Sequence, residues 1–167
     1  MTIRSARLLI ADADPQSVDR IVEAFSRDDY YLVTCGHPDE ALEMSRTETF
    51  DAVICDAAFD PRAAFVARLR KARPKLPVIA TATGSDSGIA IEAIKAGAYD
   101  FLPQPIDGEE LRRVVAEAIA AARRMTTAVV IGDAHTTDAA PGDVLIGRGR
   151  AMLEVYKNLG RLTATPV

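Results

Sequence analysis

The segment Ala93–Pro105, which reads AIKAGAYDFLPQP, decides the fold class of this chain. The end of a helix, a glycine at position 97, a short apolar run at 99–102 and a Pro-X-Pro turn follow one another directly. Glycine commonly ends a helix, because it adopts the left-handed conformation without a steric penalty. A helix that passes straight into an apolar strand is typical of proteins built from alternating strands and helices.

The same alternation extends over most of the chain. Continuous apolar runs predict strands of a parallel sheet covered on both faces, at 7–11, 30–35, 51–55, 77–81 and 99–102. Apolar residues at helical spacing predict helices at 15–27, 38–46, 61–72, 85–96 and 107–125. We therefore expect an α/β fold with a doubly wound five-stranded parallel sheet and five helices. Ligands of such sheets bind at the carboxyl ends of the strands.

Composition excludes several classes of protein. Hydrophobic residues make up 49% and charged residues 26% of the chain, which is typical of globular proteins. The net charge of −4 and the aromatic content of 5% do not favour nucleic-acid binding. No apolar run is long enough for a membrane span and no secretory signal is present, so we expect a cytoplasmic location. Cys35 and Cys55 are expected to be buried reduced thiols, and His37 and His135 to be solvated.

Three carboxylates follow predicted strands. Asp12 and Asp14 come after the first strand, and Asp56 ends the third. In a parallel sheet these strand ends are neighbours, and like charges at close range are costly unless a hard cation or a proton is bound. The alternative is that such residues only cap the next helix, as Asp14 before Pro15 is placed to do. Spacing alone leaves both interpretations open.

Residues 5–125 resemble the receiver domains of two-component response regulators. The segment quoted above is similar to the family's AGAxDFLxKP, FDAVICD to its phosphoacceptor strand, and LLIADADP to its hhhxDDDP. The resemblance implies the flavodoxin/CheY-like strand order 2-1-3-4-5, with Asp56 as the phosphoacceptor and Asp12 as the first acid of a Mg²⁺-binding pair. It also implies a cis peptide bond between Gln104 and Pro105 and an aromatic switch at Phe101; the alternative for Phe101 is that it only packs on the edge strand.

Three positions of the site depart from the family's pattern. Ala13 replaces the second acid, Ala82 the switch hydroxyl and Gln104 the lysine. Thr81 and Thr83 flank Ala82, but strand alternation predicts that neither presents its hydroxyl correctly. The loop after Asp56 also lacks the family's Met-Pro-x-x-x-Gly and is about two residues shorter.

These losses predict a degenerate phosphorylation site. Mg²⁺ binding by Asp12 and Asp56 is weakened, and a phosphoryl group added to Asp56 lacks its nearest compensating cation. We expect phosphorylation of Asp56 to be weak or absent. The alternative is a conventional receiver, in which Asp12, Asp14 and Asp56 still assemble a metal site.

The composition changes beyond residue 125. Residues 126–143 are small, polar and turn-forming, which predicts a linker. Residues 144–167, VLIGRGRAMLEVYKNLGRLTATPV, resemble the start of the AAA+ domain in NtrC-type sigma-54-dependent activators. The G-x-x-x-x-G-K-[ST] loop that binds nucleotide does not occur in the sequence, so we expect no ATP hydrolysis and no enzyme activity from this chain. Since the chain stops within this motif, we expect a truncated gene or a cut fragment.

The function implied by these resemblances is regulatory. We expect a receiver module that controls a sigma-54-dependent activator and that binds a sensor histidine kinase or another protein. A homodimer through the face formed by residues 85–96, 99–102 and 107–125 is a further expectation, and direct DNA binding by this chain is not expected. A flavodoxin-type cofactor binder has the same topology, but Asp12 and Asp14 would repel a flavin phosphate.

Overall fold

The structure is a computed structural model that describes residues 6–28, 30–59, 63–83 and 87–127. The predicted segment 144–167 and nearly all of the predicted linker 126–143, with His135, lie outside these residues. Strands and helices alternate strictly in the order β1 (Ala6–Ala11), α1 (Pro15–Ala24), β2 (Tyr30–Cys35), α2 (Pro38–Thr47), β3 (Ala52–Asp56), α3 (Ala64–Ala72), β4 (Val78–Thr83), α4 (Ser87–Lys95), β5 (Asp100–Gln104) and α5 (Gly108–Thr127).

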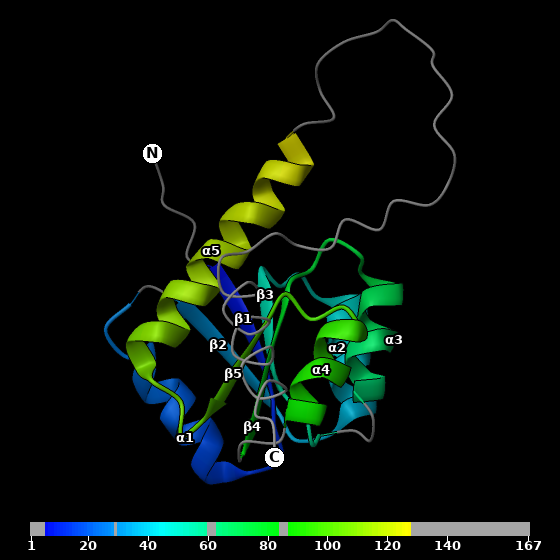
Figure 1. Cartoon of the computed structure of the whole chain (residues 1–167). Helices are drawn as coiled ribbons and strands as arrows, with labels where there is room; N and C mark the ends of the chain where they lie inside the picture. The colour runs from blue at the N-terminus through cyan, green and yellow to red at the C-terminus, as the bar shows by residue number, and fades with distance from the viewer. Residues whose placement is uncertain (1–5, 29, 60–62, 84–86, 128–167) are drawn as a thin grey trace, which may run out of the picture. The chain divides into compact units, whose positions relative to one another are not determined.

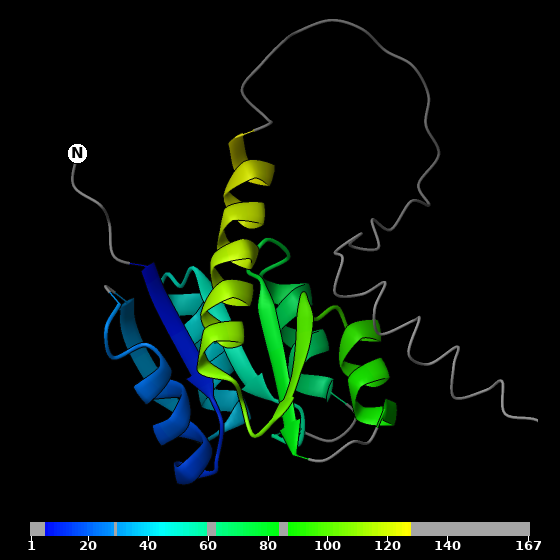
Figure 2. The ribbon, with the colours of Figure 1, turned by 60° about the vertical axis from the view of Figure 1, so that its left-hand side comes forward.

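The five strands form one parallel sheet in the order β2-β1-β3-β4-β5 (Figure 1). Helices α1 and α5 cover one face, and α2, α3 and α4 cover the other (Figures 1 and 2). The order and the strand directions confirm the fold predicted from the sequence. They also place β3 at the centre of the sheet, with β2 and β5 at its edges.

Alternation along the strands creates two hydrophobic cores. Leu8, Ile10 and Ile54 point to the side of α1 and α5, where Leu111 and Val115 of α5 are fully buried. Leu9, Val53 and Cys55 point to the opposite side, against α2, α3 and α4. Both sides of the central strands are thus apolar, which is why these runs are continuous in the sequence.

The boundaries of some elements differ from those predicted. Helix α1 ends at Ala24 instead of continuing to residue 27, because the amides of Phe25 and Ser26 bond to carbonyls three residues back and tighten the last turn. Strand β4 continues to Thr83, beyond the predicted end at residue 81, because Ala82 and Thr83 pair with residues 103 and 104 of β5.

The register brings the carboxyl ends of the central strands to one edge of the sheet. Ala11 is opposite Cys55, Asp56 is opposite Thr81, and Thr83 is opposite Gln104. The last residues of β1, β3, β4 and β5 therefore lie along this edge. No helix in the described part of the chain is both long and apolar enough to cross a membrane.

Candidate functional site

Asp12 is the most deeply buried carboxylate at this edge, with 3% of its surface exposed. Its Oδ1 atom accepts a hydrogen bond from the Asp14 amide at 2.8 Å, and its own amide donates to the Cys35 carbonyl at 3.1 Å. The second oxygen, Oδ2, is buried without a hydrogen-bond partner. An unpartnered buried carboxylate oxygen is costly, and it favours the binding of a cation.

Asp56 ends β3 and is only partly buried. Burial raises the pKa of its carboxyl above the ordinary value; the hydrogen bond from the Ala58 amide, 3.0 Å to Oδ1, opposes this, and the charges of Asp12 and Asp14 add to the rise. The side chain is thus partly accessible, and the charge of Asp12 acts on it. The rise in the pKa therefore reflects burial of the carboxyl first and the neighbouring negative charges second.

Asp14 has a different task from the other two carboxylates. It is exposed and is the N-cap of α1, and its Oδ1 atom accepts a hydrogen bond from the Gln16 amide at 3.1 Å. Of the two interpretations left open by the sequence, helix capping is the one for which the structure shows a contact. Ala13, which lies between Asp12 and Asp14 in the sequence, is exposed and offers no side-chain oxygen.

Gln104 occupies the end of β5 and connects three elements. Its Nε2 atom donates to Ser17 Oγ of α1 at 3.2 Å and lies 3.5 Å from Thr81 Oγ1 of β4. Both hydroxyl groups belong to buried residues, with 3% of Ser17 and none of Thr81 exposed. The amide therefore ties the edge strand to the first turn of α1 and to the neighbouring strand.

Asp12, Ser17, Asp56, Thr81 and Gln104 form what we call the polar rim. Sequence reasoning missed Ser17 and placed the Thr81 hydroxyl away from the site, whereas the structure puts it beside the Gln104 amide. The register pairs Thr81 with Asp56, so these side chains share a face of the sheet. A serine in the first turn of a helix that begins directly after the acidic segment was the signal that could have revealed Ser17.

The remaining predicted positions are apolar or exposed. Ala82 is 2% exposed and contributes no hydroxyl group, while Thr83 is exposed. Phe101 is partly buried on edge strand β5, packed against the core on the side of α2, α3 and α4. The predicted cis peptide bond between Gln104 and Pro105 is confirmed. Cys35 and Cys55 are buried as predicted, and His37 is exposed.

The polar rim fits a divalent cation only in part. Asp12 offers a buried free oxygen and Asp56 an accessible carboxylate, and magnesium sites use one or two protein carboxylates together with water and phosphate oxygens. Within the described ranges, no cluster of three or more acidic, histidine or cysteine side chains is placed to hold a metal. Within this part of the chain, a metal would therefore depend on the two carboxylates of Asp12 and Asp56.

Comparison with known proteins gives a family match over most of the described chain. The model of the response regulator receiver domain matches residues 8–116. The chain is 32% identical, over 162 residues, to the DNA-binding transcriptional regulator NtrC of Rhizobium meliloti (strain 1021), covering 96% of this chain and 32% of the relative. It is 31% identical, over 123 residues, to the transcriptional regulatory protein ZraR of Escherichia coli (strain K12), covering 72% of this chain and 28% of the relative.

Solved structures show the same fold. A putative response regulator from Chloroflexus aurantiacus superposes with a TM-score of 0.66 at 25% identity, covering 70% of this chain and 99% of that one. NtrX from Brucella abortus, solved in complex with ADP, superposes with a TM-score of 0.73 at 22% identity, covering 96% of this chain and 36% of that one. The chain spans about a third of the length of the curated regulators that it matches most extensively.

Proposed function

This chain belongs to the response regulator receiver domain family of two-component signalling, and we propose that it is the receiver module of an NtrC-type, sigma-54-dependent activator whose phosphorylation site is degenerate. The observation that carries the proposal is Gln104. At the position where the resemblance places a lysine, a neutral amide is already bonded to Ser17 and lies beside Thr81. It brings no positive charge to the edge of the sheet.

The electrostatics of Asp56 support weak phosphorylation. A phosphoryl group adds about −1.5 to −2 charges at neutral pH. At the polar rim this charge would develop beside Asp12, whose proximity adds to the rise that burial causes in the pKa of Asp56. Among the residues that the structure describes, no lysine or arginine belongs to the polar rim to offset it.

A bound Mg²⁺ would reduce that repulsion by neutralising charge on the transferred phosphoryl group. Asp12 Oδ2 and the free oxygen of Asp56 are the groups that would hold it. Ala13 removes the third carboxylate, and Asp14 is engaged as a helix cap, so the affinity for the metal should be low. Signalling would then depend on protein contacts more than on a phosphorylated state.

The wider assignment rests on the sequence. Residues 1–125 would be the receiver, 126–143 a linker and 144–167 the first part of an AAA+ domain of the sigma-54 interaction type. The partner would be a sensor histidine kinase or another protein. The chain would have no enzymatic activity of its own, because the nucleotide-binding loop does not occur in its sequence.

A conventional receiver, in which Asp56 accepts a phosphoryl group with Mg²⁺, is the second candidate. The unpartnered Oδ2 atom of buried Asp12 favours it, because that oxygen is placed to accept a cation. The two candidates differ only in whether Asp56 is modified and whether modification changes the structure.

The test is the intact mass and the amide NMR shifts of the chain with Mg²⁺, before and after acetyl phosphate or beryllium fluoride. We expect no adduct and no shift changes around Asp56 and Phe101. The triple variant A13D/A82T/Q104K, which restores the family residues, should gain an adduct, and adding D56N to it should remove the adduct. An adduct on the unmodified chain that is lost in D56N would establish the conventional receiver.

A further inference from the structure

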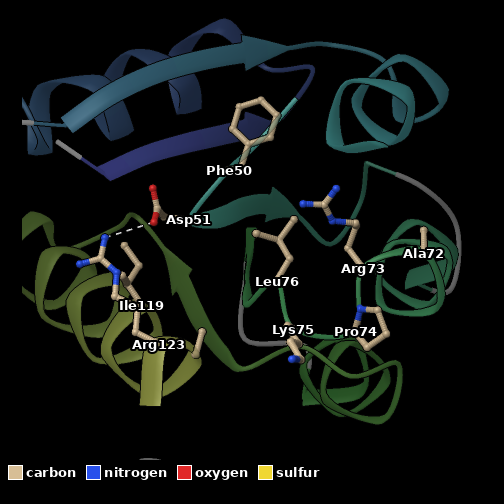
Figure 3. Close-up of a pocket in the computed structure, with 10 residues that line it drawn as sticks. Phe50, Asp51, Ala72, Arg73, Pro74, Lys75, Leu76, Ile119 and Arg123 are labelled. Atoms are coloured by element: carbon tan, nitrogen blue, oxygen red, sulfur yellow. Dashed lines mark hydrogen bonds and ion pairs between the residues drawn. The ribbon is translucent and has the colours of Figure 1, made fainter. Parts of the chain in front are cut away.

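The edge of the sheet opposite the polar rim carries a separate pocket. It has a volume of about 750 Å³ and lies where β3 and β4 begin, beside the last turns of α5 (Figure 3). Asp51 precedes β3 and Leu76 precedes β4, whereas Asp56 and Thr81 of the polar rim lie near the far ends of these strands. The pocket is therefore independent of the phosphorylation site.

Core residues form its floor and basic residues its margin. The floor of the pocket is formed by Phe50, Leu76 and Ile119, which are buried residues of the core. Its apolar surface is completed by Ala72 and Ala122. Arg73, Lys75 and Arg123 lie around this surface. We call this region the basic pocket; its volume lies within the range of known ligand sites, which combine an apolar lining with a few charged groups.

The single acidic group of the basic pocket is already engaged. Asp51 Oδ2 accepts a hydrogen bond from the Arg7 amide at 2.9 Å, and its Oδ1 atom pairs with Arg123 at 3.2 Å. Figure 3 shows Arg123 turned toward Asp51 and the Arg73 guanidinium group reaching from the end of α3 toward Phe50. Among the described residues, neither Arg73 nor Lys75 forms an ion pair with an acidic side chain, so both positive charges are available to a ligand, in a chain whose net charge is −4.

The loop that presents these charges is held in place. Arg70 of α3 donates from Nη1 to the carbonyls of Pro74 and Leu76, the second at 3.3 Å. The Leu76 amide in turn donates to the Arg73 carbonyl at 3.1 Å. A fixed loop reduces the entropy lost on binding, so its charges can contribute to affinity.

We propose that the basic pocket is a docking site for an acidic peptide segment of a partner protein, one that places an apolar side chain against Phe50 and Leu76 and carboxylates against Arg73 and Lys75. Charge complementarity selects an acidic partner. The open form of the pocket favours a polypeptide over an enclosed small molecule, because little of a small ligand would be buried there. The receiver would thus have a contact surface that does not depend on the state of Asp56.

The test is a titration of the full chain with the probe peptide acetyl-Asp-Leu-Asp-Phe-amide, followed by amide NMR shifts. We expect shifts confined to residues 50–51, 72–76 and 119–123, and affinity that falls as salt is added. The variant R73E/K75E should bind the peptide at least about tenfold more weakly, because two positive charges of the basic pocket are reversed. D56N should bind as well as the unmodified chain.

Two controls separate specific docking from general attraction. R20E/R27E makes the same change of net charge at two exposed arginines of the α1 region and should leave binding unchanged. The peptide acetyl-Asn-Leu-Asn-Phe-amide, which lacks the carboxylates, should bind far more weakly. Equal binding by R73E/K75E, equal binding of the uncharged peptide, or no shifts at millimolar peptide would overturn the proposal.

Discussion

At the scale of single residues, two departures from the family pattern, one beside the polar rim and one within it, offset one another in charge but not in chemistry. Relative to the pattern of the receiver family, Ala13 removes a negative charge and Gln104 a positive one, so the net charge of the site is unchanged. Asp12 and Asp56 nevertheless remain as two coupled carboxylates, and burial keeps the pKa of Asp56 high. In the proposed function, the groups that are missing are a metal ligand and a mobile cation, the two that would respond to a phosphoryl group.

The raised pKa of Asp56 predicts the pH dependence of stability. Because the folded state binds the proton more tightly than the unfolded state, this residue's contribution is greatest at low pH and is lost as the pH rises from 3.8 through the folded pKa. D56N should therefore raise the free energy of unfolding at pH 7 by up to ~1 kcal/mol, since solvent screening limits the effect at a half-buried site. Urea unfolding between pH 4 and 8, with D19N at an exposed position as the control, measures it. Lower stability of D56N at pH 7 would contradict the prediction.

The contacts of the Gln104 amide with Ser17 and Thr81 should contribute more to the free energy of unfolding than the exposed side chain of Thr83 does. Q104A leaves the buried hydroxyls of Ser17 and Thr81 without this donor, and we expect a loss of about 1–2 kcal/mol in the free energy of unfolding. The matched variant T83A truncates an exposed side chain of β4, two positions after Thr81. It should change the free energy of unfolding by less than about 0.5 kcal/mol. Equal effects in chemical denaturation would show that the contacts of Gln104 contribute nothing.

At the scale of the element, the stability of helix α1 distinguishes the two roles considered for Asp14, helix cap and metal ligand. As an N-cap, Asp14 can be replaced by Asn without loss, whereas D14A should cost about 1 kcal/mol of stability. If Asp14 were a metal ligand, D14N would instead lower the affinity for Mg²⁺. Thermal unfolding together with a Mg²⁺ titration followed by NMR distinguishes the two outcomes, and we expect D14N to match the unmodified chain in both.

The first turns of helix α5 pack against the hydrophobic core, whereas its last turn does not. Leu111 is fully buried, while Met125, on the predicted apolar stripe, is 59% exposed. L111A should lower the free energy of unfolding by about 2–5 kcal/mol, and M125A by less than about 0.5 kcal/mol. Guanidinium denaturation of the two variants checks this, and a cost for M125A comparable to that of L111A would mean that Met125 is covered in solution.

At the scale of the whole molecule, the exposed side chains of the β5 edge are the reason to expect a second copy. Tyr99 is 41% exposed and precedes edge strand β5, and Met125 ends the stripe of α5. We propose a homodimer through α4, β5 and α5. The variant Y99E should raise the dissociation constant of this dimer about tenfold or more. Sedimentation velocity measures this, with Y31E at the opposite edge as the control, since Tyr31 is 60% exposed. A monomeric chain at all concentrations would refute the dimer.

The fold could be predicted from the sequence almost in full, because it depends on repeated local patterns. Apolar runs, helical spacing and the glycine at position 97, which adopts a φ of 106°, each specify an element without reference to the rest of the chain. The limits of α1 and β4 were less accurate, because the tightened last turn of α1 and the pairing of β4 with β5 decide where these elements stop. Resemblance to the receiver family then identified Asp12, Asp56 and Gln104 by position.

By itself, therefore, the sequence determined the α/β class, the strand order through its family resemblance, and the residue types Ala13, Ala82 and Gln104, on which the proposal of a degenerate site rests. Only the tertiary structure decided that Gln104 is bonded to Ser17 and lies beside Thr81, that Asp12 keeps an unpartnered oxygen, and that Arg73 and Lys75 line a pocket with Arg123. These relations join residues distant in the chain. They depend on strand register and helix placement, which local sequence patterns do not encode.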